Sequence, residues 1–122
     1  MKVVDTSAML AFLFGEPGAD KALAAFDGGA MSVVNVAEVL IRLARDGVDP
    51  SASLSRVERC GLALEPPTLA DAVAAAKLPP DNGLSLGDRL CVAFAHRLGA
   101  SVVTADRLWD RLKLPVAVEL IR

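Results

Sequence analysis

The first dozen residues, MKVVDTSAMLAF, constrain the fold more than any other stretch of the chain. Lys2-Val3-Val4 is an apolar run too short for a helix, and it ends at Asp5. Asp5-Thr6-Ser7 offers three side chains that cap helix N-termini, and a helical apolar pattern follows. A buried strand that ends in a carboxylate and turns directly into a helix places that carboxylate at the C-terminal edge of a sheet. Open α/β folds bind their ligands at that edge.

The same alternation of strand and helix continues along the chain. Apolar runs predict further strands over residues 30–34, 62–65, 100–104 and 116–121. Helical patterns bounded by caps, glycines and prolines predict helices over about 19–26, 35–46, 50–60, 68–77, 85–98 and 106–113. Strands that alternate with helices are typical of a parallel sheet with right-handed crossovers. We therefore predict one α/β domain over residues 1–122 with about five strands.

Composition narrows the class of protein. The chain has 122 residues, of which 53% are hydrophobic, so it is long and apolar enough to bury a core. Its net charge of −2 gives no overall attraction to nucleic acid, so any RNA binding must use local arginines or a bound cation. No apolar run approaches the roughly 18 residues that a membrane span needs. Asp5 interrupts any signal-peptide core, and we expect a cytoplasmic protein without membrane contact.

Cysteine and histidine offer no catalytic or metal-binding pattern. Cys60 and Cys91 lie far apart without CxxC or Cys/His spacing, and we interpret both as reduced packing residues. His96 is the only histidine of the chain, so neither a histidine metal site nor a Ser-His-Asp triad is supported. We interpret it as structural.

Acidic residues, in contrast, stand at four predicted strand ends or helix starts. Asp5 ends the first strand, and Glu38 falls in the first turn of the helix predicted after the second strand. Asp88 lies in the first turn of the long helix, and Asp106 follows the fourth strand by two residues. Strand C-termini and helix N-termini share one edge of a parallel sheet. We therefore expect all four carboxylates to point toward the same rim.

Each acid also has an ordinary structural interpretation. Asn35 and Glu38 have capping-box spacing, the helix start at Asp88 nearly fits the same pattern, and Asp5 and Asp106 make common N-caps. As a set, however, carboxylates gathered at one rim repel one another unless they titrate or bind a cation. Mg²⁺ or Mn²⁺ suits carboxylate oxygens and waters. Such an ion can generate hydroxide from bound water and stabilise the charge that builds on a phosphodiester.

Four stretches of the chain resemble, in order, the motifs of the PIN domain family: VVDTSAMLAFL, NVAEVL, LSLGDRLCVAFA and VVTADRLW. The resemblance covers essentially the whole chain and is strongest to VapC-type toxins of bacterial toxin–antitoxin pairs. It implies a Rossmann-like sheet of strand order 3-2-1-4-5 and the activity of an Mg²⁺- or Mn²⁺-dependent endoribonuclease. It also implies a homodimer, and a small antitoxin whose C-terminal segment wraps the toxin and blocks its site.

The resemblance further implies roles for individual residues. Four carboxylates would form the acidic metal site, namely Asp5, Glu38, Asp88 and Asp106. In the family pattern Asp5 and Asp88 are the expected direct metal ligands. Side chains that orient or assist the carboxylates would be Thr6 or Ser7, Thr104 and Asn35.

Several charged neighbours of these acids have two open interpretations. Arg89 and Arg107 each follow a proposed site acid, and each is either a contact to an RNA phosphate or a surface ion pair with a neighbouring carboxylate. Arg42 lies four positions after Glu38, which predicts an i,i+4 ion pair. Asp110 lies one helical turn beyond the last of the four acids, and we favour a solvated side chain over a site residue.

Apolar residues add predictions about packing and partners. Trp109 has leucines beside it, which indicates packing in the core rather than base stacking. Phe12, Phe14 and residues 39–43 give more apolar helix surface than a small domain must bury, which predicts a dimer or antitoxin contact.

Two other functions fit an α/β chain of this size. The first is a non-catalytic protein- or RNA-binding module on the same fold. Loss of a site acid would favour it, but all four acids are present. An aspartyl-phosphate hydrolase is expected to carry a second Asp two residues after the first, where this chain has Ser7, and a receiver domain is expected to carry its phosphoacceptor on a middle strand. The ribonuclease remains the leading hypothesis.

Overall fold

The computed structural model describes all 122 residues, which build one sheet of five parallel strands. The strands are β1 (Lys2–Val4), β2 (Ala30–Ser32), β3 (Ala63–Glu65), β4 (Ser101–Thr104) and β5 (Val118–Leu120). Their order, β3-β2-β1-β4-β5, is the one that the resemblance implied. β1 is therefore the central strand, and its C-terminal end lies between those of β2 and β4.

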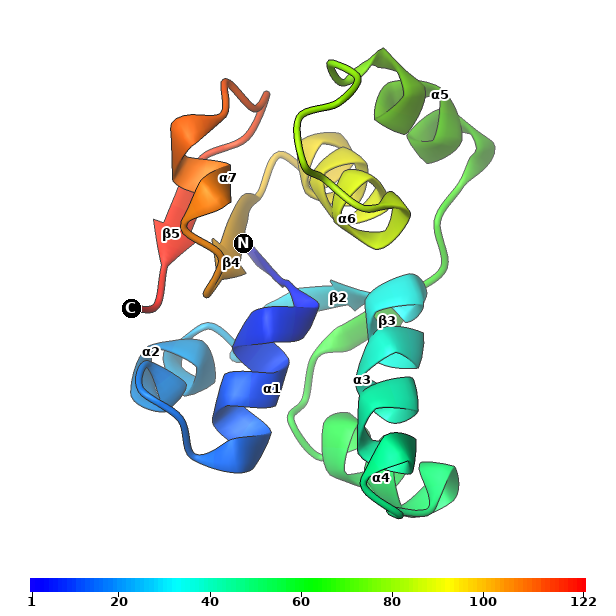
Figure 1. The fold of residues 1–122 in the computed structure, drawn as a ribbon, viewed down its shortest axis with the longest axis vertical. Helices are drawn as coiled ribbons and strands as arrows, with labels where there is room; N and C mark the ends of the chain where they lie inside the picture. The colour runs from blue at the N-terminus through cyan, green and yellow to red at the C-terminus, as the bar shows by residue number, and fades with distance from the viewer.

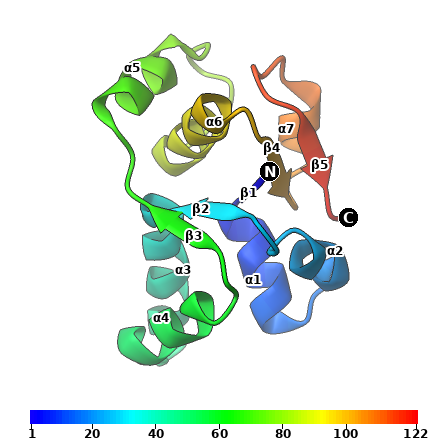
Figure 2. The same cartoon turned by 180° about the vertical axis from the view of Figure 1, so that it is seen from behind.

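Helices cover both faces of the sheet. They are α1 (Thr6–Phe14), α2 (Ala19–Ala24), α3 (Val33–Arg45), α4 (Pro50–Glu58), α5 (Leu69–Lys77), α6 (Leu86–Leu98) and α7 (Leu108–Arg111). Figure 1 shows α1 to α4 on one side of the sheet and α5 to α7 on the other, and the view from behind in Figure 2 shows the same division. The α/β class predicted from the alternation of strands and helices is confirmed.

Alternating side chains of the strands divide the core into two clusters. Val4 and Val103 pack with α1, α3 and α4, whereas Val3 and Val102 pack with α6 and α7. Successive strand residues point to opposite faces, and in a parallel sheet both faces are covered. The strands therefore appear in the sequence as short continuous apolar runs, because their side chains are buried on both faces. Trp109 is fully buried in the second cluster, which confirms its predicted packing role.

The second strand ends earlier than predicted. β2 stops at Ser32, whose Oγ accepts a hydrogen bond from the Val34 backbone N–H at 3.2 Å and so caps α3. α3 therefore begins two residues before Asn35, and the predicted capping box of Asn35 and Glu38 is wrong. Glu38 lies in the second turn of α3 instead of the first. A serine inside an apolar run ends the strand because its side chain satisfies a free N–H at a helix start.

The C-terminal elements are shorter than predicted. The helix expected over 106–113 is only Leu108–Arg111, and the strand expected over 116–121 is only Val118–Leu120. Arg107 occupies the N-cap position of α7, so Asp106 lies one residue before the cap position that was predicted for it, although its side chain still accepts a hydrogen bond from the Leu108 N–H at the start of the helix. Pro115 disfavours helical backbone at Leu114.

The structure also shows which of the remaining apolar and cysteine side chains are buried and which are exposed. Within the apolar stretch 39–43, Val39 and Leu43 are buried in the core and offer no surface to a partner, whereas Ile41 is 56% exposed and Phe14 is 42% exposed. Cys60 and Cys91 are both free thiols, and burial raises the pKa of Cys91 well above its usual value. None of the helices combines the length and the apolar composition that crossing a membrane requires.

Candidate active site

The C-terminal ends of β1 and β4 bring Asp5 and Thr104 together. Asp5 is the N-cap of α1, and its Oδ2 accepts hydrogen bonds from Ser7 Oγ at 2.7 Å, Thr104 Oγ1 at 2.9 Å and the Ser7 backbone N–H at 3.3 Å. Its second oxygen, Oδ1, is buried and has no hydrogen-bond partner. A buried carboxylate oxygen without a partner is unusual, because buried polar groups are normally paired.

Burial changes the acidity of this carboxyl group. Only 3% of Asp5 is exposed, and burial raises its pKa from 3.8 to about 6. Hydrogen bonds from Ser7 and Thr104 act in the opposite direction, and the charge of Asp88 adds to the rise. In the cation-free protein the group therefore holds its negative charge poorly, as expected for a site that a cation completes.

Glu38 reaches the same rim from α3. Its Oε1 accepts hydrogen bonds from Thr6 Oγ1 at 2.6 Å and Asn35 Nδ2 at 2.7 Å. Its carboxylate lies against Gly87, where a Cβ atom would stand 2.6 Å from Oε2. Sequence reasoning missed Gly87. A glycine inside the first turn of a helix weakens the helix, so its presence there indicates that another group approaches the backbone too closely for a side chain.

Asp88 begins α6 beside this glycine. It forms a capping box with Ser85, whose backbone N–H donates to Asp88 Oδ2 at 2.9 Å. The side chain is half-buried, and burial raises its pKa, with smaller contributions from the charges of Glu38 and Asp106 and opposing hydrogen bonds from Ser85. Because Asp88 in turn raises the pKa of Asp5, the four carboxylates form one interacting group.

Asp106 is the exposed member of the group. Its Oδ1 accepts a hydrogen bond from the Leu108 backbone N–H at 2.9 Å, and its own N–H donates to Thr104 Oγ1 at 3.1 Å. Thr104 therefore connects Asp106 to Asp5 through one hydroxyl. Ser7 Oγ likewise accepts a hydrogen bond from the Ala105 backbone N–H at 2.9 Å, which ties α1 to the end of β4.

The four carboxylates share one arrangement: one oxygen takes all of the hydrogen bonds within the protein, and the other takes none. The bonded oxygens are Asp5 Oδ2, Glu38 Oε1, Asp88 Oδ2 and Asp106 Oδ1. Capping and orienting bonds therefore leave one oxygen of each side chain without a hydrogen bond, and in Asp5 this oxygen is buried. For Asp5, Asp88 and Asp106 a capping bond and a role in the site are compatible.

The donor set fits a hard divalent cation. All candidate ligands are carboxylate oxygens, one of which is the unpartnered buried oxygen of Asp5. No group of three His, Cys, Asp or Glu side chains is placed to hold a single ion. Mg²⁺ is commonly held by one or two carboxylates and several waters, so the chemistry of this site fits that ion without a closed protein cage.

Arg89 is engaged within the protein. Its guanidinium donates to the carbonyl oxygens of Pro79 at 2.8 Å and Leu78 at 3.1 Å, and to Asn82 Oδ1 at 3.2 Å. These bonds fix the loop between α5 and α6. Of its two predicted roles, the ion pair with a neighbouring carboxylate is not formed, and the guanidinium faces carbonyl oxygens of its own chain.

The other charged neighbours lie outside the hydrogen-bond network of the acids. Arg107 is exposed and forms no salt bridge. Arg42 pairs with Asp46 at 3.9 Å and lies 5.0 Å from the centre of the Phe14 ring, so the predicted ion pair with Glu38 is wrong. Asp110 is exposed and makes no side-chain hydrogen bond with the site.

Comparison with known families assigns the chain. The family model described as the PIN domain matches residues 2–114. The chain belongs to the PIN domain family. A search of curated proteins finds no match.

Solved structures show the same fold for this PIN domain. A chain of a toxin–antitoxin complex from Klebsiella pneumoniae has a TM-score of 0.79 at 17% identity, covering 100% of this chain and 98% of that one. A chain of the DNA-bound VapBC of Salmonella typhimurium has a TM-score of 0.75 at 17% identity, covering 99% and 98%. A chain of FitAcB from Neisseria gonorrhoeae has a TM-score of 0.68 at 20% identity, covering 99% and 98%.

Proposed function

We propose that this PIN domain is a metal-dependent endoribonuclease and the toxin of a toxin–antitoxin pair. The observation that carries the proposal is the rim of four carboxylates, each with one oxygen free, around the buried unpartnered Oδ1 of Asp5. Membership of a family of nucleases supports the class of reaction. Similarity of fold to chains from toxin–antitoxin complexes supports the biological role.

In this proposal Asp5 and Asp88 hold Mg²⁺ or Mn²⁺, with Glu38 and Asp106 completing the acidic rim. When bound, such an ion supplies a Lewis acid for the phosphodiester and lowers the pKa of a bound water. The protein's own part is to keep the ligands in place. Ser7 and Thr104 fix Asp5 through Oδ2. The bonds from Thr6 and Asn35 fix Glu38 in the same way.

Arg107 is the residue that we propose to contact an RNA phosphate. It directly follows Asp106, is exposed, and has no carboxylate partner to compete for its guanidinium. A net charge of −2 means that substrate binding depends on such local cations. Arg89 is not proposed for this role, because its donors are used on loop carbonyls.

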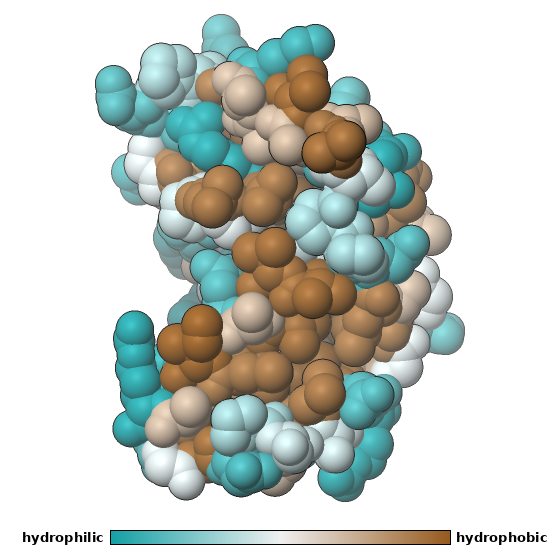
Figure 3. Space-filling view, turned by 90° about the vertical axis from the view of Figure 1, so that its right-hand side faces the viewer, coloured by the Kyte–Doolittle hydropathy of each residue, from teal (hydrophilic) through white to brown (hydrophobic).

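Exposed apolar side chains support protein partners. Figure 3 shows apolar side chains gathered over the side of the molecule that carries α3 and α5. Val33 and Ile41 of α3 and Val73 of α5 are 42%, 56% and 56% exposed. We propose this face for the homodimer. Phe12 and Phe14, at the far end of α1, are proposed for contact with an antitoxin.

Cleavage of a structured RNA mixture with Mg²⁺, with Mn²⁺ or with EDTA tests the proposal. We expect the parent protein to cut RNA only with metal, and Asp5→Asn to lose this activity. The matched control is Asp27→Asn, because Asp27 is an exposed acid that precedes β2 and so lies toward the opposite edge of the sheet. Equal cutting by parent and Asp5→Asn contradicts the proposal. No cutting, together with no change of melting temperature on adding Mn²⁺, favours the non-catalytic binding module.

A further inference from the structure

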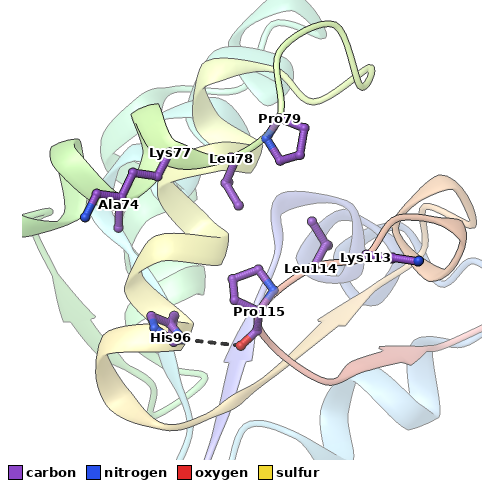
Figure 4. Close-up of a pocket in the computed structure, with 8 residues that line it drawn as sticks. All are labelled: Ala74, Lys77, Leu78, Pro79, His96, Lys113, Leu114 and Pro115. Atoms are coloured by element: carbon purple, nitrogen blue, oxygen red, sulfur yellow. Dashed lines mark hydrogen bonds between the residues drawn. The ribbon is translucent and has the colours of Figure 1, made fainter.

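A second candidate site lies away from the carboxylate rim. It is a cavity of about 420 Å³ between the end of α5, the loop that follows it, the C-terminal half of α6 and the segment between α7 and β5 (Figure 4). This volume lies in the range of pockets that bind small ligands, about 300–1,000 Å³. Nothing in the proposed catalytic site uses these residues.

The lining of the cavity has an apolar middle and basic ends. Lys77 and Lys113 lie at opposite ends, with Leu78, Leu114 and Pro115 between them (Figure 4). No acidic side chain is among the lining residues. The cavity also holds the only histidine and two of the four lysines of a chain whose net charge is negative. Its chemistry therefore fits a ligand with an apolar part and a negative group on either side.

Hydrogen bonds hold the walls of the cavity in place. His96 Nδ1 lies 3.2 Å from the carbonyl oxygen of Pro115, which joins α6 to the segment before β5. A carbonyl only accepts, so Nδ1 carries the proton. On the opposite wall, Arg89 binds the carbonyl oxygens of Leu78 and Pro79, which also offsets the negative C-terminal end of α5. These bonds connect the walls of the cavity to α6 on both sides.

The cavity and the rim are connected by two segments of chain. α6 runs from Asp88 at the rim to His96 at the cavity, which is about 12 Å along the helix axis at 1.5 Å per residue. The segment that starts at Asp106 reaches the cavity at Lys113. One strand of a stacked duplex advances about 3.4 Å per nucleotide along its axis, and we take this spacing for a stacked segment of the substrate. The span from rim to cavity therefore corresponds to about three or four nucleotides.

We propose that the cavity binds one nucleotide of the RNA substrate, about three or four nucleotides from the bond that is cut. The base lies between Leu78, Leu114 and Pro115, and the phosphates on its two sides are bound by Lys77 and Lys113. The alternation of phosphate, base and phosphate in RNA matches the basic, apolar and basic order of the lining. This inference rests on the proposed nuclease function.

The test follows binding at His96, whose imidazole signals in an NMR spectrum need no assignment because the chain has one histidine. The probes are adenosine 3′,5′-bisphosphate, which is too small to span to the rim, and a 2′-O-methyl hexanucleotide, both in EDTA. We expect both to shift the His96 signals. In Lys77→Gln/Lys113→Gln the hexanucleotide binds about tenfold or more weakly, and the slope of log K against log[salt] falls by about 1.4. The matched control is Lys21→Gln on α2, which should bind like the parent.

Other results overturn the inference. His96 signals that do not move at saturating hexanucleotide exclude the cavity as a nucleotide site. A shift caused by an acidic hexapeptide of Glu and Leu, but not by the bisphosphate, assigns the cavity to a protein partner instead. Because binding is read in EDTA, it is independent of cleavage. Metal-dependent cutting with silent His96 signals overturns only the cavity, and His96 binding in a protein that cuts no RNA overturns only the nuclease.

Discussion

Replacing Asp5 by asparagine should affect the stability of the metal-free protein more favourably at neutral pH than at acid pH. The side chain is 3% exposed, and burial raises its pKa from 3.8 to about 6. An acid with a raised native pKa binds protons more tightly in the folded state, so stability falls as the pH rises from about 4 to about 6 and is level above that. The charge on Asp5 should therefore cost the folded protein about 3 kcal/mol at neutral pH. Asparagine has no charge and keeps a carbonyl oxygen for the bonds from Ser7 and Thr104.

Urea unfolding in EDTA at about pH 4.5 and about pH 7.5 measures this effect. The asparagine amide N–H groups replace the unpartnered Oδ1 and also lack partners, which costs about 1–3 kcal/mol at both pH values. Because this cost is the same at both pH values, it cancels from the change in the stability difference between them. We expect the free energy of unfolding of Asp5→Asn, relative to the parent, to rise by about 2 kcal/mol between the two pH values. Asp27→Asn, at an exposed acid, should show no such change.

The pH dependence of the difference in stability between parent and Asp5→Asn tests whether burial raises the pKa of Asp5. A difference between parent and Asp5→Asn that is the same at both pH values refutes the claim that burial raises the pKa of Asp5. With Mn²⁺ added at neutral pH the parent should gain stability relative to Asp5→Asn, because an ion that binds only the folded parent stabilises it by mass action. Stabilisation of Asp5→Asn by Mn²⁺ to the same extent as the parent shows that the ion binds elsewhere.

Two further changes test the rim and the apolar face. Gly87→Ala should reduce RNA cleavage, because its Cβ would stand 2.6 Å from Glu38 Oε2 and displace that carboxylate. Alanine favours the helix by up to about 1 kcal/mol, but the displacement strains the bonds from Thr6 and Asn35, so the free energy of unfolding should change by no more than about 1 kcal/mol in either direction. Equal cleavage by parent and variant contradicts this role. Ile41→Glu combined with Val73→Glu should convert the proposed dimer to monomer in sedimentation analysis without loss of helix signal, and an unchanged mass shows that the dimer uses another face or does not form.

Local sequence signals predicted the central part of the fold. The run before Asp5, the cap at the start of α1 and the Ser85–Asp88 capping box are features of adjacent residues, and the structure has all of them. The predicted end of β2 was two residues too late. Ser32 stands inside an apolar run, and it can cap a helix only because the backbone turns directly after it, which the run itself does not indicate. Strand order came from the family resemblance, since periodicity identifies strands without ordering them.

Contacts between distant residues account for the parts of the site that the sequence could not reveal. Glu38 is held by Thr6, which is 32 residues earlier, and this bond requires α1 and α3 to lie side by side. The Thr104 bond to Asp5 spans 99 residues and exists because β1 and β4 are neighbours in the sheet. Arg89 was expected to contact either an RNA phosphate or a neighbouring carboxylate, but the path of the loop after α5 places carbonyl oxygens within its reach. Such contacts follow from topology, which no local pattern contains.

The rim also shows why capping signals and catalytic signals coincide in this chain. A carboxylate that is free to rotate must be ordered when it binds a ligand, whereas one held through a single oxygen is already oriented. Asp88 is held by the backbone N–H of Ser85, and Asp106 by that of Leu108, and each keeps its second oxygen free. Helix starts provide such N–H donors at the edge where the parallel strands end. A residue that looks like an ordinary cap in the sequence is therefore also well placed to serve as a preorganised ligand.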